Sequence, residues 1–289
     1  MLAAEYNRTK LFCKGHAEID LEQAICARLA IDAPACSWRI ESRPGVGRFL
    51  VAARDLAANE TVFSELPLVV AAPAADSKEQ VLRSEIVAVA TQLLCEPPGS
   101  PARLLQEPDF SSDEDGALAG SFRAWTLDVL RALQLRPQPL VRADGTAVTL
   151  SEGMLRWALG VASVNVHGRS DPPRGVLGLL ASLMEHSCSP SASADVGSAA
   201  EGSVVTLRTT RVVRTGEALS IAYVARDAPV DERRRQLRLQ HGFVCACERC
   251  VAELAAAGGE RESESWRRAW EDRTWCGVDP YTGESMCCG

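Results

Sequence analysis

Lysine is scarce in this chain of 289 residues: only Lys10, Lys14 and Lys78 occur, whereas arginine is abundant. We attribute this bias to codon usage rather than to chemistry. The formal net charge is −7 at pH 7, which argues against a broad nucleic-acid surface, because phosphate binding needs clustered Lys and Arg. The basic run "ERRRQLR" at 232–238 predicts a helix face rather than a nuclear-localisation signal. We therefore expect no direct nucleic-acid partner, although basic protein tails would suit an acidic protein.

Long apolar runs are also missing. No window approaches the roughly 18 consecutive apolar residues of a transmembrane helix, and the first residues, "MLAAEYNRTK", lack the layout of a signal peptide. The composition, 46% apolar and 24% charged, is ordinary for a globular protein. We expect a soluble, non-secreted monomer of the cytoplasm, the nucleus or both, with no membrane contact.

Cysteine, by contrast, is plentiful, with 11 residues spread irregularly. The cluster "FVCACERC" at 243–250 indicates reduced thiols and a metal site rather than disulfides. Structural zinc usually has four ligands, so Cys245, Cys247 and Cys250 leave one place, for which Cys188 in "EHSCSP" is the candidate. The alternative is a group of buried free thiols. A second set matches no trusted metal spacing, and unrelated thiols are favoured for it: Cys13, His16, Cys26 and Cys36.

Strand patterns dominate the first part of the chain and helical patterns the middle third. From Ser37 to Ala72, β-branched and apolar residues punctuated by turns predict a small antiparallel sheet. The apolar stripe within 78–95 has helical spacing. Thr149 and Glu152 form a capping box for a further helix over 150–164.

Strands return in the last third, at 203–213 and 218–224, where they predict a second patch of sheet. A helix follows over 230–242, with Asp231 as its N-cap and Gly242 as its terminator. It leads directly into the cysteine cluster. In the tail, Trp266 and Trp270 are one helical turn apart and predict a docking helix.

These motifs together resemble the SET-domain protein-lysine methyltransferases, in particular their SMYD-like branch with its arthropod members. "EHSCSP" resembles the family's "NHSCxPN", and "RTGEALSIAYV" resembles its "GEELxxxY" strand. "FVCACERC" is similar to the post-SET "FxCxCxxC", and "RPGVGRFLVAARDL" to the opening glycine strand. The matches run in the family's order from about Ser37 to Cys250. The branch's MYND zinc finger is not recognisable.

The resemblance implies an α+β fold: a SET-domain β-fold of small sheets with a knot-like crossing, a helical insert and a zinc-binding post-SET segment. It places the SET domain at 37–242, the insert at about 76–176 and the post-SET segment at 243–250. Residues 1–36 have no assigned role, and 251–289 form a helical tail. The crossing brings Cys188 to Cys245, Cys247 and Cys250, whose structural zinc holds Phe243 over the active site.

The implied activity is S-adenosylmethionine-dependent N-methylation of a protein lysine, with a histone tail as one candidate substrate. Tyr223, in the position of the strand tyrosine, is the expected catalytic residue, since its hydroxyl can orient the amine. His186 is expected to contact the adenine through its backbone, with its ring in a structural role; the alternative is a satisfied core histidine. The residues that the resemblance assigns to the cofactor are Gly47, Arg48, Phe49, Asn165, Glu185, His186 and Phe243.

Four positions depart from the family pattern. Glu185 and Ser191 replace the first and last Asn of the "NHSCxPN" motif, Phe49 replaces a glycine, and His241 stands where many members have a second Tyr in the substrate channel. We expect Arg48 to neutralise part of the charge of Glu185. The departures leave a second hypothesis open, a catalytically inactive SET-fold scaffold that binds partner proteins.

Overall fold

The computed structural model describes a large part of the chain: residues 10–11, 19–20, 25–26, 36–43, 47–72, 80–97, 99–108, 117–170, 173–198, 202–256, 276–278 and 285–287. Several predictions fall outside these residues. They concern most of the segment 1–36, with Cys13 and His16, and the tail helix with Trp266 and Trp270.

The helices predicted within 78–95, 150–164 and 230–242 are present. The α-helices are α2 (Glu85–Cys95), α3 (Ala117–Gln134), α4 (Glu152–Asn165), α5 (Val230–His241) and α6 (Glu248–Ala256), and the 3-10 turns are η2 (Gln80–Leu82), η3 (Pro101–Leu104) and η4 (Ala181–Leu183). The hydroxyl of Ser84 caps α2 by accepting the Val87 N–H at 3.1 Å. The buried stripe of α2, which includes Val89 and Leu93, faces the core.

Two predicted caps are wrong. The N-cap of α4 is Ser151, whose hydroxyl accepts the Met154 N–H at 3.3 Å, so Thr149 lies outside the helix. α5 begins after Pro229, which places Asp231 inside the first turn. There its carboxylate still lies near the positive end of the helix dipole. Gly242 ends α5 as predicted, with a φ of +76° that favours glycine.

The strands form several small sheets. Antiparallel pairs join β1 (Lys10–Leu11) to β2 (Ile19–Asp20), β3 (Trp38–Arg43) to β4 (Gly47–Ala52), and β13 (Cys276–Val278) to β14 (Ser285–Cys287). One three-stranded sheet has the order β10 (Ala192–Val196), β11 (Val205–Thr209), β5 (Thr61–Glu65), and the other β6 (Val69–Ala71), β8 (Pro173–Leu177), β7 (His167–Ser170). β9 (Glu185–His186) pairs with β12 (Ser220–Ile221).

The predicted strand positions between residues 37 and 72 are therefore confirmed, but their union in one sheet is wrong. β3 and β4 pair with each other, whereas β5 and β6 pair with strands more than 100 residues downstream. The two strands predicted at 203–213 and 218–224 likewise join different sheets. Such long-range pairings depend on packing of the whole chain and leave no local pattern.

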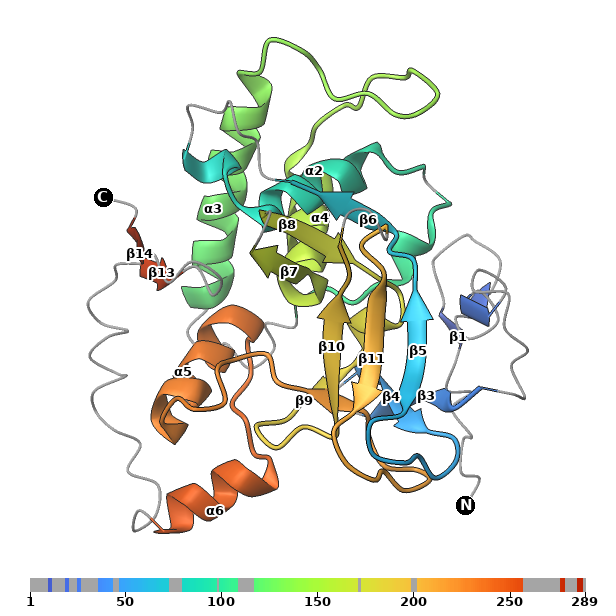
Figure 1. Cartoon of the computed structure of the whole chain (residues 1–289). Helices are drawn as coiled ribbons and strands as arrows, with labels where there is room; N and C mark the ends of the chain where they lie inside the picture. The colour runs from blue at the N-terminus through green and yellow to red at the C-terminus, as the bar shows by residue number, and fades with distance from the viewer. Residues whose placement is uncertain are drawn as a thin grey trace, which may run out of the picture.

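Helices and sheets occupy different regions of the molecule. In Figure 1, α2, α3 and α4 gather at the top of the molecule, next to β6, β7 and β8, while α6 lies at the bottom. α5 lies between these regions and contacts α4. One buried cluster contains residues of β4, α2, α4 and β8. A smaller one consists of Cys188, Leu237, Cys245 and Cys250. None of the helices in the described ranges has both the length and the apolar content to cross a bilayer.

Candidate active site and metal centre

Two short segments from distant parts of the sequence meet at the centre of the site. β9 lies parallel to β12, with Glu185 opposite Ser220 and His186 opposite Ile221. Buried Ser191 closes the crossing, because its hydroxyl donates to the Ala218 carbonyl and accepts the Ser220 N–H, both at 2.9 Å. The predicted meeting of the "EHSCSP" stretch with the tyrosine strand is thereby confirmed.

The four cysteines predicted to hold zinc lie together beside this crossing. The sulfurs of Cys188, Cys245, Cys247 and Cys250 all lie within 4.8 Å of one another. Sulfurs about 2.3 Å from one tetrahedral ion would be about 3.8 Å apart. The observed spread fits that arrangement, and a metal here would join the crossing to the segment after Phe243.

The thiols of this four-cysteine cluster differ in acidity. Burial opposes ionisation of Cys247, but N–H groups of Cys250 and Cys188 donate to its sulfur and lower its pKa to about 6. Burial raises the pKa of Cys250 to about 11, and it also raises that of Cys245. Because a divalent cation stabilises thiolates, the set fits zinc with all four positions filled by protein.

His186 connects the four-cysteine cluster to Tyr223. Its Nδ1 accepts the Tyr223 N–H at 3.1 Å, and its Nε2 lies 3.3 Å from the Cys188 sulfur. A ring nitrogen that accepts a hydrogen bond carries no proton, so the proton of the neutral ring is on Nε2 and faces the sulfur. Burial, followed by the nearby charges of His241 and Arg233, lowers the pKa of His186 to about 4. The protein itself therefore engages both ring nitrogens.

Tyr223 presents a fixed, neutral hydroxyl. Its O–H donates to the Met184 carbonyl. Burial, followed by the charge of Glu185, raises the pKa of Tyr223 well above its usual range. The hydroxyl therefore stays protonated, and its oxygen remains an acceptor of defined position.

Other rings surround this tyrosine. The centroid of the Tyr223 ring is 4.8 Å from that of His241 and 5.2 Å from that of His186, and Phe243 lies 5.9 Å from His186. Burial lowers the pKa of His241 to about 4. Within the described residues, the buried Nδ1 of His241 has no hydrogen-bond partner. The structure thus brings Tyr223, His186, His241 and Phe243 into one aromatic cluster.

Gly47, Arg48 and Asn165 meet around the end of η3, at Leu104 and Gln106. Arg48 donates to the Leu104 carbonyl, and the Asn165 amide donates to the Gln106 carbonyl at 2.8 Å. Gly47 has a φ of +86°, and a Cβ there would lie 1.8 Å from the Gln106 side-chain nitrogen. The Nη1 of Arg48 is buried without a partner in the part of the chain that the structure describes. Such a donor fits an anionic group, for example the carboxylate of S-adenosylmethionine.

Glu185 faces Arg43, so the prediction that Arg48 neutralises part of its charge is wrong. The Glu185 carboxylate lies 3.7 Å from Arg43, whose guanidinium covers the ring of Phe49 at 4.6 Å. Arg48 pairs across the hairpin with Ser42, the neighbour of Arg43, so the two arginines project from opposite faces. Burial raises the pKa of Glu185, and Arg43 opposes this shift. The Phe49 ring is only 2% exposed, so its side chain is packed within the protein.

Two buried charged residues near the site were missed by the sequence reasoning. Glu65 at the end of β5 and Arg233 in α5 are 2% and 1% exposed. Arg233 precedes buried Leu237 by one helical turn, and this spacing could have indicated an inward side chain. Glu65 ends the strand "TVFSE" on the same face as the buried Phe63, which is a weaker signal.

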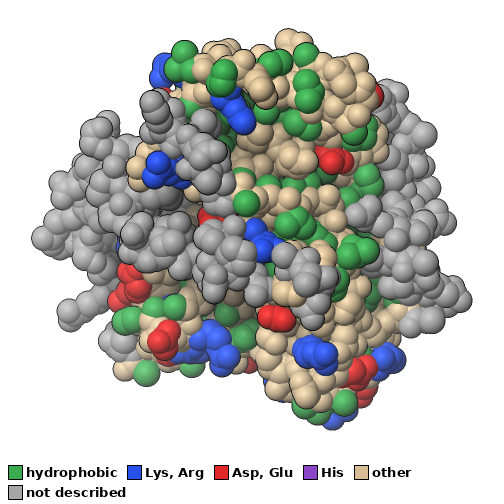
Figure 2. Space-filling model, turned by 45° about the horizontal axis from the view of Figure 1, so that its top comes forward, with side chains coloured by type: hydrophobic (Ala, Val, Ile, Leu, Met, Phe, Trp, Pro, Cys, Tyr) green, Lys and Arg blue, Asp and Glu red, His purple; other side chains and the backbone are tan. Residues whose placement is uncertain are grey.

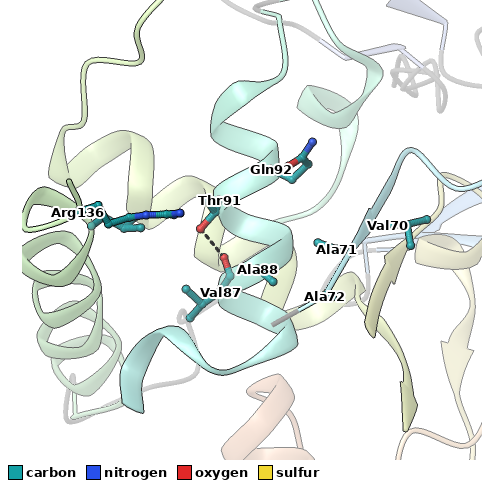
Figure 3. Close-up of a pocket in the computed structure, with 9 residues that line it drawn as sticks. Val70, Ala71, Ala72, Val87, Ala88, Thr91, Gln92 and Arg136 are labelled. Atoms are coloured by element: carbon teal, nitrogen blue, oxygen red, sulfur yellow. Dashed lines mark hydrogen bonds between the residues drawn. The ribbon is translucent and has the colours of Figure 1, made fainter. Parts of the chain in front are cut away.

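A pocket of about 380 Å³ lies away from these residues, between β6, α2 and the end of α3. Figure 3 shows Val70 and Ala71 on one side and Val87, Thr91 and Arg136 on the other. None of the predicted site residues lines it. On the face of the molecule in Figure 2, coloured acidic and basic side chains are interspersed rather than gathered by sign.

Comparisons with known proteins point to one family. The family model described as "SET domain" matches residues 47–224. The histone-lysine N-methyltransferase SMYD3 of Homo sapiens is 41% identical over 72 residues, which are 25% of this chain and 16% of that protein. The histone-lysine N-methyltransferase SET5 of Candida glabrata is 34% identical over 161 residues, or 53% of this chain and 29% of that protein.

Solved structures share the fold at low identity. The SET domain of LSMT bound to methyl-lysine and AdoHcy has a TM-score of 0.55 and 16% identity, with 80% of this chain and 58% of that chain covered. Rubisco LSMT bound to AdoMet has a TM-score of 0.52 and 17% identity, with 78% and 57% covered. The chain therefore spans little more than half of these structures, and 16% to 29% of the curated relatives.

Proposed function

Since the chain belongs to the SET-domain family, we propose that it is an S-adenosylmethionine-dependent protein-lysine N-methyltransferase. The observation that supports this most is the parallel pairing of β9 with β12, which brings His186 next to Tyr223. The SMYD-like branch and a histone tail as substrate belong to the same proposal. They are supported by the relatives named histone-lysine N-methyltransferase.

The organisation and location follow from the same proposal. We assign the SET domain to 37–242, its insert to about 76–176 and a zinc-binding post-SET segment to 243–250, with a helical tail that begins with α6. The zinc ligands would be Cys188, Cys245, Cys247 and Cys250. The protein acts as a monomer in the cytoplasm, the nucleus or both, without contact to nucleic acid or membrane.

The aromatic cluster would prepare the substrate lysine. A free lysine has a pKa of about 10.4 and is charged at neutral pH, so it must lose a proton before it can attack. Burial between Tyr223, His241 and Phe243 would lower that pKa, because a desolvated ammonium is disfavoured. The bound cofactor supplies an electrophilic methyl group on its sulfonium. The fixed oxygen of Tyr223 then orients the amine, and such alignment can contribute roughly 7 to 11 kcal/mol to the barrier reduction.

Cofactor recognition would involve two groups of residues. The Nη1 of Arg48, which has no partner among the described residues, suits the carboxylate of S-adenosylmethionine. Gly47 keeps the backbone next to it free of a side chain. An ionised Glu185 accepts hydrogen bonds and therefore suits the ammonium group, and its negative charge would also attract the sulfonium. Phe243 is 36% exposed and is available for contact with the adenine.

The test is transfer of a labelled methyl group from S-adenosylmethionine to lysine-containing peptides, with amino-acid analysis of the product. We expect methyl-lysine from the parent protein and a large loss of turnover in Tyr223→Phe at unchanged cofactor affinity. Label on another amino acid, or equal turnover in the variant, would contradict the proposal. Absence of both binding and transfer would favour the scaffold hypothesis, which the departures at Glu185 and His241 leave open.

A further inference from the structure

Arg233 is a buried cation that contacts the four-cysteine cluster. It is the fourth residue of α5 and is 1% exposed. Its Nε lies 3.2 Å from the Cys188 sulfur, and its Nη2 lies 3.7 Å from the Cys250 sulfur. The same Nη2 donates to Glu253 at 2.6 Å, and Nη1 donates to the Ala228 carbonyl at 2.5 Å. All three nitrogens of the guanidinium therefore have partners.

The burial of this guanidinium requires negative charge close by, since a buried unpaired cation is costly. Glu253 supplies one carboxylate, but its side chain is 34% exposed. The other contacts are sulfurs, which are weak acceptors as thiols and much better ones as thiolates. A tetrathiolate around a divalent ion has a net charge of −2, which a buried arginine partly offsets. The contacts of Arg233 thus match the metal-bound state of the cysteines.

α5 also leads from the metal centre to the aromatic cluster. The helix ends at His241, turns through Gly242 and continues into Phe243 and the cysteines. Cys188 has a second N–H neighbour, the Nε2 of His186, which is also linked to Tyr223. A shift of α5 relative to the sulfurs would therefore alter both the four-cysteine cluster and the aromatic cluster.

We propose that Arg233 is a positioning residue of the metal centre, which donates hydrogen bonds to the thiolates of Cys188 and Cys250, retains the metal and anchors α5 against it. The proposal rests on the zinc site of the proposed function and is independent of methyl transfer. Arg233 places a positive charge next to two sulfurs and directs two N–H groups of its guanidinium at them. Arg233 is not itself a ligand.

The test compares zinc retention in Arg233→Met, Arg233→Lys and the matched control Arg235→Met. Arg235 lies on the same helix, but it is 38% exposed and its guanidinium pairs with Glu232. In competition with a chromogenic chelator, we expect Arg233→Met to lose about 10-fold to 100-fold in zinc affinity, as outer-shell partners of metal ligands do. Arg233→Lys, which keeps the charge but not the fork, should lose less, and Arg235→Met should match the parent.

Cobalt substitution separates this role from a general effect on stability. Removal of N–H donors makes the thiolates more electron-rich, so the sulfur-to-cobalt charge-transfer band should move to longer wavelength in both Arg233 variants and not in Arg235→Met. If Arg233→Met does not fold, Arg233→Lys decides. An unchanged band and unchanged zinc affinity in a folded Arg233 variant would overturn the proposal. A parent protein that binds no zinc would instead refute the zinc site itself.

Discussion

Glu65→Gln tests how the fold holds the segment that leads into the active site. The Glu65 carboxylate, 2% exposed, accepts the N–H groups of Leu179, Leu180 and Ala181 at 3.0, 3.2 and 2.6 Å. This segment enters η4 and then the strand with Glu185. One buried anion therefore satisfies three consecutive backbone donors across a large sequence separation.

The magnitude follows from those three bonds. Hydrogen bonds to a charged acceptor contribute about 1.5 to 3 kcal/mol each, and a buried donor left unsatisfied costs about 1 to 3 kcal/mol. A glutamine keeps one acceptor oxygen but turns an NH₂ group toward at least one N–H. We therefore expect Glu65→Gln to lower the free energy of unfolding by about 3 kcal/mol.

The assay is equilibrium unfolding in urea at a constant, saturating zinc concentration, with Glu60→Gln as control. Glu60 accepts one backbone N–H and pairs with Arg54, but its side chain is 24% exposed, so its loss should matter far less. Gly178→Ala adds a second test, because a Cβ there would lie 2.3 Å from the Glu65 carboxylate. Its cost should shrink in a Glu65→Ala background. Equal stability of Glu65→Gln and parent would refute the reasoning.

Three further predictions concern the metal, a turn and the acid range. Cys188→Ser should reduce the bound zinc measured by elemental analysis and lower the melting temperature, because metal binding and folding are coupled. Unchanged values would contradict the claim that zinc joins Cys188 to the three cysteines at 245–250. Gly47→Ala should lower the free energy of unfolding in urea by about 1 to 2 kcal/mol, because an L-residue is strained at this positive φ. A second substitution, Gln106→Ala, should relieve the clash with the new Cβ and leave the backbone strain. The pKa of Asp55 is lowered from 3.8 to about 2, chiefly by the Thr215 N–H and by Arg214. The ionised Asp55 therefore stabilises the fold fully above about pH 4, and this contribution is lost as the pH falls toward 2. The difference in free energy of unfolding between parent and Asp55→Asn should narrow over that range. A difference that stays constant would contradict this prediction.

Much of the fold could be predicted because its signals are local. The apolar stripe of α2 has helical period, and Gly242 ends α5 as a left-handed residue. The C-x-C-x2-C spacing and Cys188 also pointed to one site, and the structure brings their sulfurs together.

What could not be predicted depends on contacts between distant segments. Glu65 meets backbone groups 114 residues downstream, and a strand pattern alone gives no hint of them. The partner of Glu185 is set by the register of the β3–β4 hairpin, which selects Arg43 and turns Arg48 away. Even the local cap of α4 was misplaced by two residues, because Thr149 and Ser151 are both good caps and geometry chooses between them.

Titration calorimetry of the folded, zinc-loaded protein with S-adenosylmethionine tests the proposed activity most directly, since an enzyme of this class must bind its methyl donor before any protein substrate is known. The matched variants are Arg48→Met and Arg54→Met. The first removes a buried donor that has no partner within the described ranges, whereas the Arg54 side chain is 55% exposed and pairs with Glu60. We predict binding of one ligand per chain that Arg48→Met weakens and Arg54→Met leaves unchanged. Absence of binding to the folded, zinc-loaded parent would contradict the account and would favour a SET-fold interaction scaffold.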